Sequence, residues 1–232
     1  HLKDMEDYQK KFVANVSHDF RSPLTSIRGY VGAMLDGTIP PEMQEKYLKV
    51  ISGETERLEK LTQSLLALNA LDSGKRNLHP QSFDINKVLK TTAAVFEGIS
   101  TRRKISLKLL LAGTELLVYA DKEQIQQVVY NLLDNALKFS GANSTVTLET
   151  TLKNGRVFVS VKDEGEGIPK DSIQKIWERF YKTDASRGRD RKGSGLGLSI
   201  VREIINAHGQ TINVISTEGV GTEFIFTLEK SK

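Results

Sequence analysis

The chain contains no cysteine among its 232 residues. This absence excludes a disulfide framework, a zinc ribbon and a thiolate nucleophile, and it is compatible with a reducing compartment. Any chemistry that the protein performs must therefore rest on other side chains.

Long apolar runs are also missing. Residues 107–120 come nearest to one, but Lys108, Gly113 and Glu115 interrupt them, and a membrane span needs roughly 20 apolar residues. The net charge is only +4, and aromatic residues do not interleave with a basic stripe. We expect no membrane contact from this chain and no nucleic-acid partner. Because His1 leads directly into a helical pattern, we also expect a fragment of a longer protein.

The first third of the chain has the pattern of two long helices. Apolar residues recur every three or four positions over residues 12–34 and 43–68, as on one helical stripe. Pro23 should bend the first helix, and residues 37–41 (Gly-Thr-Ile-Pro-Pro) should end it. A lone antiparallel hairpin cannot bury both of its faces, so we expect residues 5–71 of two copies to form a four-helix bundle.

A mixed pattern follows. We expect domains at residues 1–72 and 83–232, joined by a linker at 73–82 that contains a helix-ending glycine and a proline. Strands paired mostly as hairpins, with helices between them, favour a two-layer α/β sandwich over a parallel dinucleotide-binding sheet. Helices are predicted at 85–98, 122–139 and 196–207, and strands at 105–111, 117–120, 146–153, 156–163, 211–216 and 222–228.

Two amides share a face of the helix predicted at 122–139. Asn131 and Asn135 are four residues apart, and Lys138 and Phe139 follow in the next turn. Amide oxygens suit Mg²⁺, which completes its shell with water and phosphate oxygens. Taken alone, two asparagines more often cap turns or face solvent, but asparagine is a poor helix former, so two of them in mid-helix need a reason, which the other motifs supply.

Two glycine-rich segments come next. Asp163 ends a strand and precedes Gly165, Gly167 and Ile168; its carboxylate is able to accept from an exocyclic amine. Residues 193–198 (Gly-Ser-Gly-Leu-Gly-Leu) lead into the helix predicted at 196–207, where glycine lets phosphate approach the helix start. Each segment alone is also typical of an ordinary loop, and the second is not a P-loop.

His18 has the most reactive setting of the histidines. It lies on the first helix between Ser17 and Asp19, with Ser22 one turn further on. Imidazole is nucleophilic near neutral pH, and a neighbouring carboxylate can orient one ring nitrogen while the other attacks. Taken alone, a helical histidine is more often a plain surface residue.

Together these segments resemble the motifs of sensor histidine kinases from two-component signalling, in that family's order. Residues 17–24 are similar to the H box, 131–139 to the N box, 163–168 to the first glycine box, 178–181 to the F box and 193–198 to the second glycine box. The resemblance covers nearly the whole chain. It implies a dimerisation and histidine-phosphotransfer hairpin that pairs into a four-helix bundle, followed by a two-layer α/β sandwich of the Bergerat ATP-binding type.

The resemblance also implies roles for individual residues. His18 would attack the γ-phosphate of ATP with Asp19 as general base, and Ser22 would assist in dephosphorylating the partner. Asn135, assisted by Asn131, would coordinate Mg²⁺. Asp163 would accept from the adenine amine. The full set implied for nucleotide binding is Asn131, Asn135, Lys138, Phe139, Asp163, Gly165, Gly167, Ile168, Phe180, Lys182, Gly193, Ser194, Gly195, Leu196, Gly197 and Leu198.

The implied reaction is autophosphorylation of His18 followed by transfer to an aspartate of a response-regulator receiver domain. The implied location is cytoplasmic, as part of a parent protein anchored in the cell membrane. Asp19 stands where the family more often has glutamate, and Ser22 where threonine or asparagine is commoner, so kinase activity is implied more firmly than phosphatase activity.

Two other functions fit parts of the pattern. A non-catalytic dimer scaffold would bind ATP only as a conformational signal, but the set His18, Asp19, Asn135 and Asp163 is intact. An ATP-hydrolysing clamp of the same superfamily would use a glutamate where this chain has Asn131, and it would lack the histidine-bearing hairpin.

Overall fold

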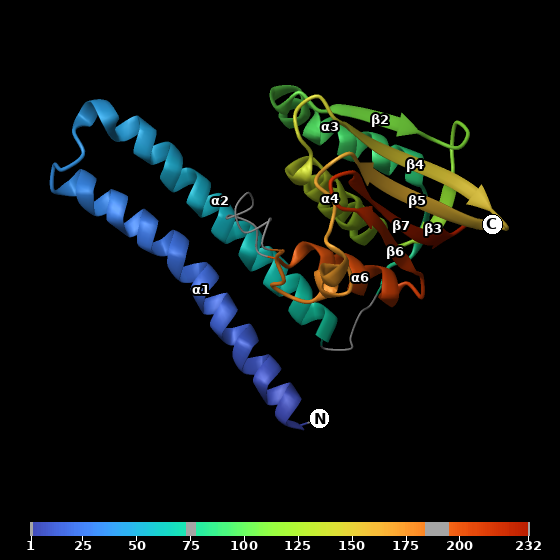
Figure 1. The fold of residues 1–232 in the computed structure, drawn as a ribbon, viewed down its shortest axis with the longest axis horizontal. Coiled ribbons are helices and arrows are strands. Elements are labelled where there is room, and N and C mark those ends of the chain that lie inside the picture. The colour runs from blue at the N-terminus through green and yellow to red at the C-terminus, as the bar shows by residue number, and fades with distance from the viewer. Residues whose placement is uncertain (1, 73–77, 184–194, 232) are drawn as a thin grey trace. The chain divides into compact units, whose positions relative to one another are not determined.

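A computed structural model describes residues 2–72, 78–183 and 195–231 of the chain (Figure 1). The chain divides into two compact units, His1–Ala70 and Leu71–Lys232. No helix in these described ranges is both long and apolar enough to cross a membrane.

The first unit is the predicted helical hairpin. Helix α1 spans Leu2–Leu35 and helix α2 spans Pro41–Asp72 (Figure 1). The helices contact each other near the loop, where the rings of Tyr30 and Tyr47 lie 5.1 Å apart. Helix α1 continues through Pro23, so the bend expected there stays a prediction.

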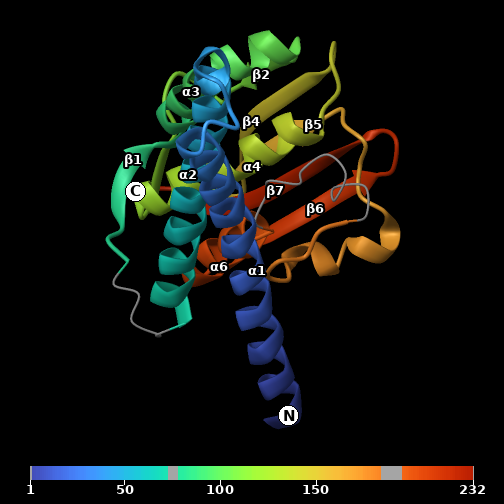
Figure 2. The ribbon, with the colours of Figure 1, turned by 90° about the vertical axis from the view of Figure 1, so that its left-hand side faces the viewer.

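The second unit is the predicted two-layer α/β sandwich. Its five-stranded sheet has the order β2-β4-β5-β7-β6, and helices α3, α4 and α6 lie against it (Figures 1 and 2). A separate two-stranded sheet pairs β1 with β3. The bounds are β1 Gln81–Asp84, α3 Ile85–Arg103, β2 Ser106–Leu110, β3 Leu117–Ala120, α4 Lys122–Phe139, β4 Thr145–Lys153, β5 Arg156–Asp163, α6 Gly197–Ala207, β6 Ile212–Thr217 and β7 Gly221–Glu229.

The core lies between the sheet and the helices. Alternate residues of β4 and β5 are buried, as expected for strands with one face on a helical layer. Helix α4 faces them with an apolar stripe at helical spacing. Residues that are fully buried here include Leu132, Leu133, Leu148, Ile200 and Phe226. This packing holds α4 and α6, the two helices that carry the N-box segment and the end of the second glycine segment, at fixed positions beside the sheet.

Two features differ from the sequence prediction. Strand β2 pairs with β4 in parallel, because the intervening chain crosses through β3 and α4 before it returns to the sheet. Strand β1 was not predicted, since four residues, Gln-Ser-Phe-Asp, are too few to show a period of two. It includes Gln81 and Ser82, which the sequence pattern assigns to the linker.

Candidate active site

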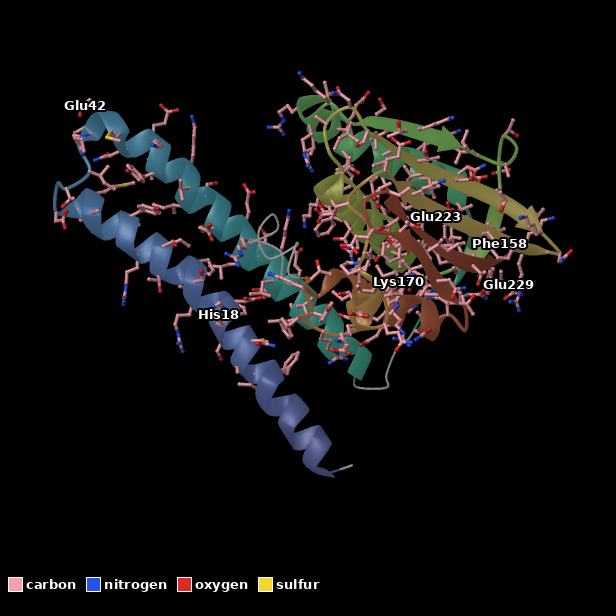
Figure 3. All side chains as sticks on the ribbon, viewed as in Figure 1. His18, Glu42, Phe158, Lys170, Glu223 and Glu229 are labelled. Atoms are coloured by element: carbon pink, nitrogen blue, oxygen red, sulfur yellow. The ribbon has the colours of Figure 1, made fainter. Side chains whose placement is uncertain are left out.

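The candidate phosphoacceptor His18 lies on α1 (Figure 3). Its side chain is 82% exposed, and its Nδ1 lies 3.5 Å from Oδ1 of Asp19, which is only 18% exposed. The carboxylate can therefore hold Nδ1 as a donor, which leaves Nε2 as the nucleophilic nitrogen. Ser22 is exposed in the following turn of the helix.

The amide face of α4 contacts the start of α6. Asn131 Nδ2 lies 3.5 Å from the backbone oxygen of Gly197, so its Oδ1 can face a ligand. Asn135 is half-buried one turn further on. Lys138 pairs with Asp134 at 2.7 Å, and about a third of each side chain is exposed. A partly exposed pair of this kind contributes little stability, so the ammonium can exchange its carboxylate for a phosphate oxygen.

Asp163 lies at the end of β5 and is 6% exposed. Its Oδ1 accepts from the backbone N–H of Gly165 at 2.9 Å and of Thr222 at 3.2 Å. Burial raises the pKa of Asp163 to about 6, although the two N–H donors act in the opposite direction. The group is therefore mostly ionised at neutral pH. Because both backbone bonds end on Oδ1, Oδ2 is the oxygen suited to accept from a ligand amine.

Glycines allow backbone segments to approach each other very closely around Asp163. A Cβ on Gly165 would lie 2.5 Å from the carbonyl oxygen of Phe139, and one on Gly167 would overlap the carbonyl oxygen of Thr217. Gly167 also has φ +70°, which side chains rarely tolerate. The loop after Asp163 therefore packs at main-chain distance against the end of α4 and against β6, and only glycine allows this.

Replacing Gly167 by alanine should displace this loop. We expect the left-handed strain to cost roughly 1–2 kcal/mol, and the overlap with Thr217 to weaken nucleotide affinity on the order of 10-fold or more. Gly155→Ala is the matched control, because Gly155 has φ +75° with open space around it. Thermal melting and titration with a fluorescent ATP analogue would measure both effects. Equal loss of affinity in the two variants would contradict a role for the close approach.

The F-box phenylalanine meets the second glycine segment. Phe180 has φ +64°, which is rare for a residue with a side chain, and its N–H donates to the oxygen of Gly195 at 2.9 Å. A Cβ on Gly195 would lie 2.8 Å from the Phe180 backbone. Arg179 forms an ion pair of 2.8 Å with Glu203 of α6. These contacts join the F box to the start of α6.

The remaining predicted residues lie near these contacts or outside the described ranges. Leu196 is fully buried, and its carbonyl accepts from Ile200 N–H at 3.0 Å as α6 begins. Ile168 N–H donates to Ser216 Oγ at 2.8 Å. Phe139, Lys182 and Leu198 are half-buried. Gly193 and Ser194 lie outside the described residues.

The sequence pattern did not assign the last hairpin to the site. Thr222 donates to Asp163, and a Cβ on Gly221 would overlap the Asp163 carbonyl oxygen. Ser216 Oγ donates to the oxygen of Gly221 at 3.0 Å, so β6, β7 and the Asp163 loop form one network. The glycines at 219 and 221 were visible as a turn signal, but their contact with Asp163 depends on pairing between distant strands.

An exposed imidazole beside a carboxylate lies on one unit, and a buried carboxylate beside closely packed glycines lies on the other. This combination defines a phosphoacceptor hairpin joined to a domain suited to bind an adenine nucleotide. Two family models agree with this division. The model of histidine kinase-, DNA gyrase B- and HSP90-like ATPases matches residues 120–232, and that of the His Kinase A phospho-acceptor domain matches residues 8–74.

Curated relatives match nearly the whole chain. Sensor histidine kinase WalK of Bacillus subtilis (strain 168) is 36% identical over 227 residues, which are 97% of this chain and 37% of WalK. YkoH of the same organism, also a sensor histidine kinase, is 37% identical over 222 residues, which are 95% of this chain and 48% of YkoH. The chain thus spans less than half the length of these relatives.

Solved structures show the same architecture. Histidine kinase AdeS of Acinetobacter baumannii is 25% identical with a TM-score of 0.77, over 93% of this chain and 98% of AdeS. ThkA, solved in complex with the response regulator protein TrrA, is 28% identical with a TM-score of 0.77, over 99% of this chain and 64% of the ThkA chain. ShkA, solved with AMPPNP, is 25% identical with a TM-score of 0.71, over 95% of this chain and 46% of the ShkA chain. The chain belongs to the sensor histidine kinase family of two-component systems.

Proposed function

We propose that this chain uses Mg-ATP to phosphorylate His18 and then passes the phosphoryl group to an aspartate of a response-regulator receiver domain. The proposal is carried by the presence of two groups in one chain. His18 is 82% exposed beside Asp19, and the carboxylate of Asp163 is buried among closely packed glycines. One group is accessible to a phosphate donor, and the other is suited to hold adenine. The nucleotide analogue bound to ShkA and the regulator bound to ThkA support the two halves of the proposal.

In the proposed reaction, Nε2 of His18 attacks the γ-phosphorus. The N–P bond forms while the bond from the γ-phosphorus to the bridging oxygen breaks, and ADP leaves with that electron pair. Asp19 accepts the proton that Nδ1 carries as positive charge builds on the ring. This agrees with its position 3.5 Å from Nδ1.

The residues of the N box suit a hard cation. Asn135, assisted by Asn131 through Oδ1, would hold Mg²⁺, and Lys138 would contact phosphate. When bound, the ion would neutralise charge on the phosphate oxygens. Amide oxygens present only weak ligands, so the nucleotide phosphates must supply part of the shell, and metal and ATP should bind together.

Removing the metal should therefore abolish labelling. With excess EDTA, we expect incorporation of γ-phosphate to fall to background and to recover when Mg²⁺ is restored. The measurement is acid-labile, base-stable phosphate on the chain after incubation with γ-labelled ATP. Full labelling in EDTA would contradict the metal requirement, and no labelling under any condition would refute the kinase proposal in favour of a non-catalytic scaffold.

Dimerisation through the hairpin is part of the proposal. Apolar side chains on both helices stay exposed in the single chain, among them Leu24 at 52%, Leu48 at 53% and Leu66 at 64%. A second copy would cover such surface. Sedimentation of the chain should give twice the monomer mass, and a monomer at micromolar concentration would contradict this.

Phosphatase activity toward the regulator is a second candidate function. The exposed hydroxyl of Ser22 one turn after Asp19 supports it, because a hydroxyl at that position can orient water. Phosphotransfer profiling against a panel of receiver domains would identify the partner, and loss of phosphate from that partner would then be measured with Ser22→Ala as comparison. Attachment of the parent protein to the cell membrane, with this chain on the cytoplasmic side, completes the proposal.

A further inference from the structure

Three hydrogen bonds converge on Asp121, the residue before the first turn of α4. Its Oδ1 accepts from Gln124 N–H at 3.2 Å and so caps the helix. Its Oδ2 accepts from the backbone N–H of His79 at 3.1 Å, and its own N–H donates to Nε2 of His208 at 3.0 Å. Asp121 is only 7% exposed, so each of these bonds replaces a contact with water that the buried residue cannot make.

The hydrogen bonds of His208 fix its tautomer. Its Nδ1 lies 2.8 Å from the carbonyl oxygen of Ile204, and a carbonyl only accepts, so Nδ1 carries the proton. Nε2 then has a lone pair for the N–H of Asp121. His208 follows the last residue of α6, so this bond ties the end of α6 to the start of α4.

The two helices are joined at a second point, by Asn131 and Gly197. Gly197 begins α6, and Asn131 lies ten residues into α4. One end of the α4–α6 pair therefore carries the nucleotide motifs. The other end holds the backbone of His79, the residue at which the chain from the hairpin reaches the sandwich.

We propose that the His79 amide, Asp121 and His208 form a linker latch that positions the nucleotide domain for phosphotransfer without touching nucleotide. The proposal rests on the proposed function. Its claim is that the latch fixes both the place and the direction in which the chain leaves the α4–α6 pair, and that this orientation raises the rate at which γ-phosphate meets His18.

The latch changes the length of chain between the end of α2 and the first fixed residue of the sandwich. Helix α2 ends at Asp72, so the bond at His79 limits the connection to the few residues between them. Without the bond, the next fixed residue is Gln81 at the start of β1, which adds about 7 Å of extended chain. Transfer between tethered groups depends on reach and, more strongly, on orientation, where small misplacements cost large factors in rate.

Substitutions can open the latch while leaving the helix cap in place. Asp121→Asn keeps an oxygen for Gln124 N–H, and asparagine caps as well as aspartate, but its NH₂ opposes the N–H of His79. His208→Leu removes the acceptor for Asp121 N–H, whereas His208→Gln offers a side-chain oxygen in its place. Asp84→Asn is the matched control, because Asp84 caps α3 with Oδ1 alone.

We expect Asp121→Asn and His208→Leu to speed hydrogen exchange at the His79 amide on the order of 10-fold or more. The rate of His18 phosphorylation at saturating ATP should fall on the order of 5- to 10-fold, while KM for ATP and affinity for ADP change less than twofold. His208→Gln should recover much of the rate, and Asp84→Asn should match the wild type in all four measurements.

Two results would overturn the proposal. Faster exchange at His79 with an unchanged rate would mean that the latch does not position the domain. A fall in rate matched by equal losses in KM and ADP affinity would mean that Asp121 and His208 merely support the pocket. If the wild type takes no phosphate, the proposed function fails first, and exchange at His79 would still show whether the latch exists.

Discussion

His18→Gln should reduce phosphate incorporation to background while leaving nucleotide affinity and folding unchanged. Nε2 of His18 is the proposed acceptor atom, and the glutamine amide is not nucleophilic. The side chain is 82% exposed, so its replacement removes no packing. Incorporation of γ-labelled phosphate, titration with a fluorescent ATP analogue and thermal melting would measure the three properties.

A matched control for this variant is His79→Gln. His79 is also an exposed histidine, and it contributes to the latch only through its backbone N–H. The His79→Gln variant should incorporate γ-labelled phosphate like the wild type. Acid-labile phosphate retained by His18→Gln would assign the acceptor to another residue, and loss of nucleotide binding in that variant would show that the substitution acts on the fold.

Asp163→Asn should strongly weaken nucleotide binding while making the nucleotide-free protein more stable. The NH₂ of asparagine would oppose the adenine amine, so affinity should fall on the order of 10- to 100-fold. The side-chain oxygen of the new amide can still accept from Gly165 and Thr222, the donors that now bind Asp163. Asp171→Asn, an exposed residue with the same change of charge, is the control.

The stability gain follows from the raised pKa. A carboxyl group whose pKa is about 6 in the folded protein and has its ordinary value of 3.8 in the unfolded chain binds its proton more tightly when folded. It stabilises the fold fully below pH 3.8 and loses that contribution as the pH rises through about 6. At pH 7 the variant avoids this loss, which amounts to about 3 kcal/mol from the difference in pKa.

Denaturant unfolding at pH 5 and pH 7 would test whether Asp163→Asn stabilises the protein and how that stabilisation changes with pH. The gain of Asp163→Asn over the wild type should be larger at pH 7 than at pH 5, and nucleotide affinity of the wild type should weaken as the pH falls below about 6, when the carboxyl begins to be protonated. A variant that is less stable than the wild type at pH 7 would contradict the burial cost assigned to Asp163.

Local patterns in the sequence were enough to predict the hairpin and the sandwich. The helix over 122–139 carries an apolar period and Asp163 precedes two glycines, and both signals lie within a few neighbouring residues. In the structure Asp163 accepts from Gly165 and α4 contacts the start of α6, while a single nucleotide site formed by the four motifs stays a prediction.

Contacts between distant segments were not predictable in the same way. Thr222 reaches Asp163 only because β5 and β7 pair in one register, and a single sequence does not contain that register. The bond from His208 to Asp121 joins residues 87 apart, and histidines outside the H box had no motif to mark them. Strand β1 depends on its pairing with β3 rather than on a pattern of its own.

The solvent exposure of His18 also bears on how long a signal lasts. A phosphorylated ring at this position would be open to bulk water on α1, beside Asp19. Its survival time would then be set by the intrinsic hydrolysis of the N–P bond and by whichever protein covers it. The lifetime of the phosphorylated state would then depend on how often another protein binds over His18, because α1 itself does not protect the N–P bond from water.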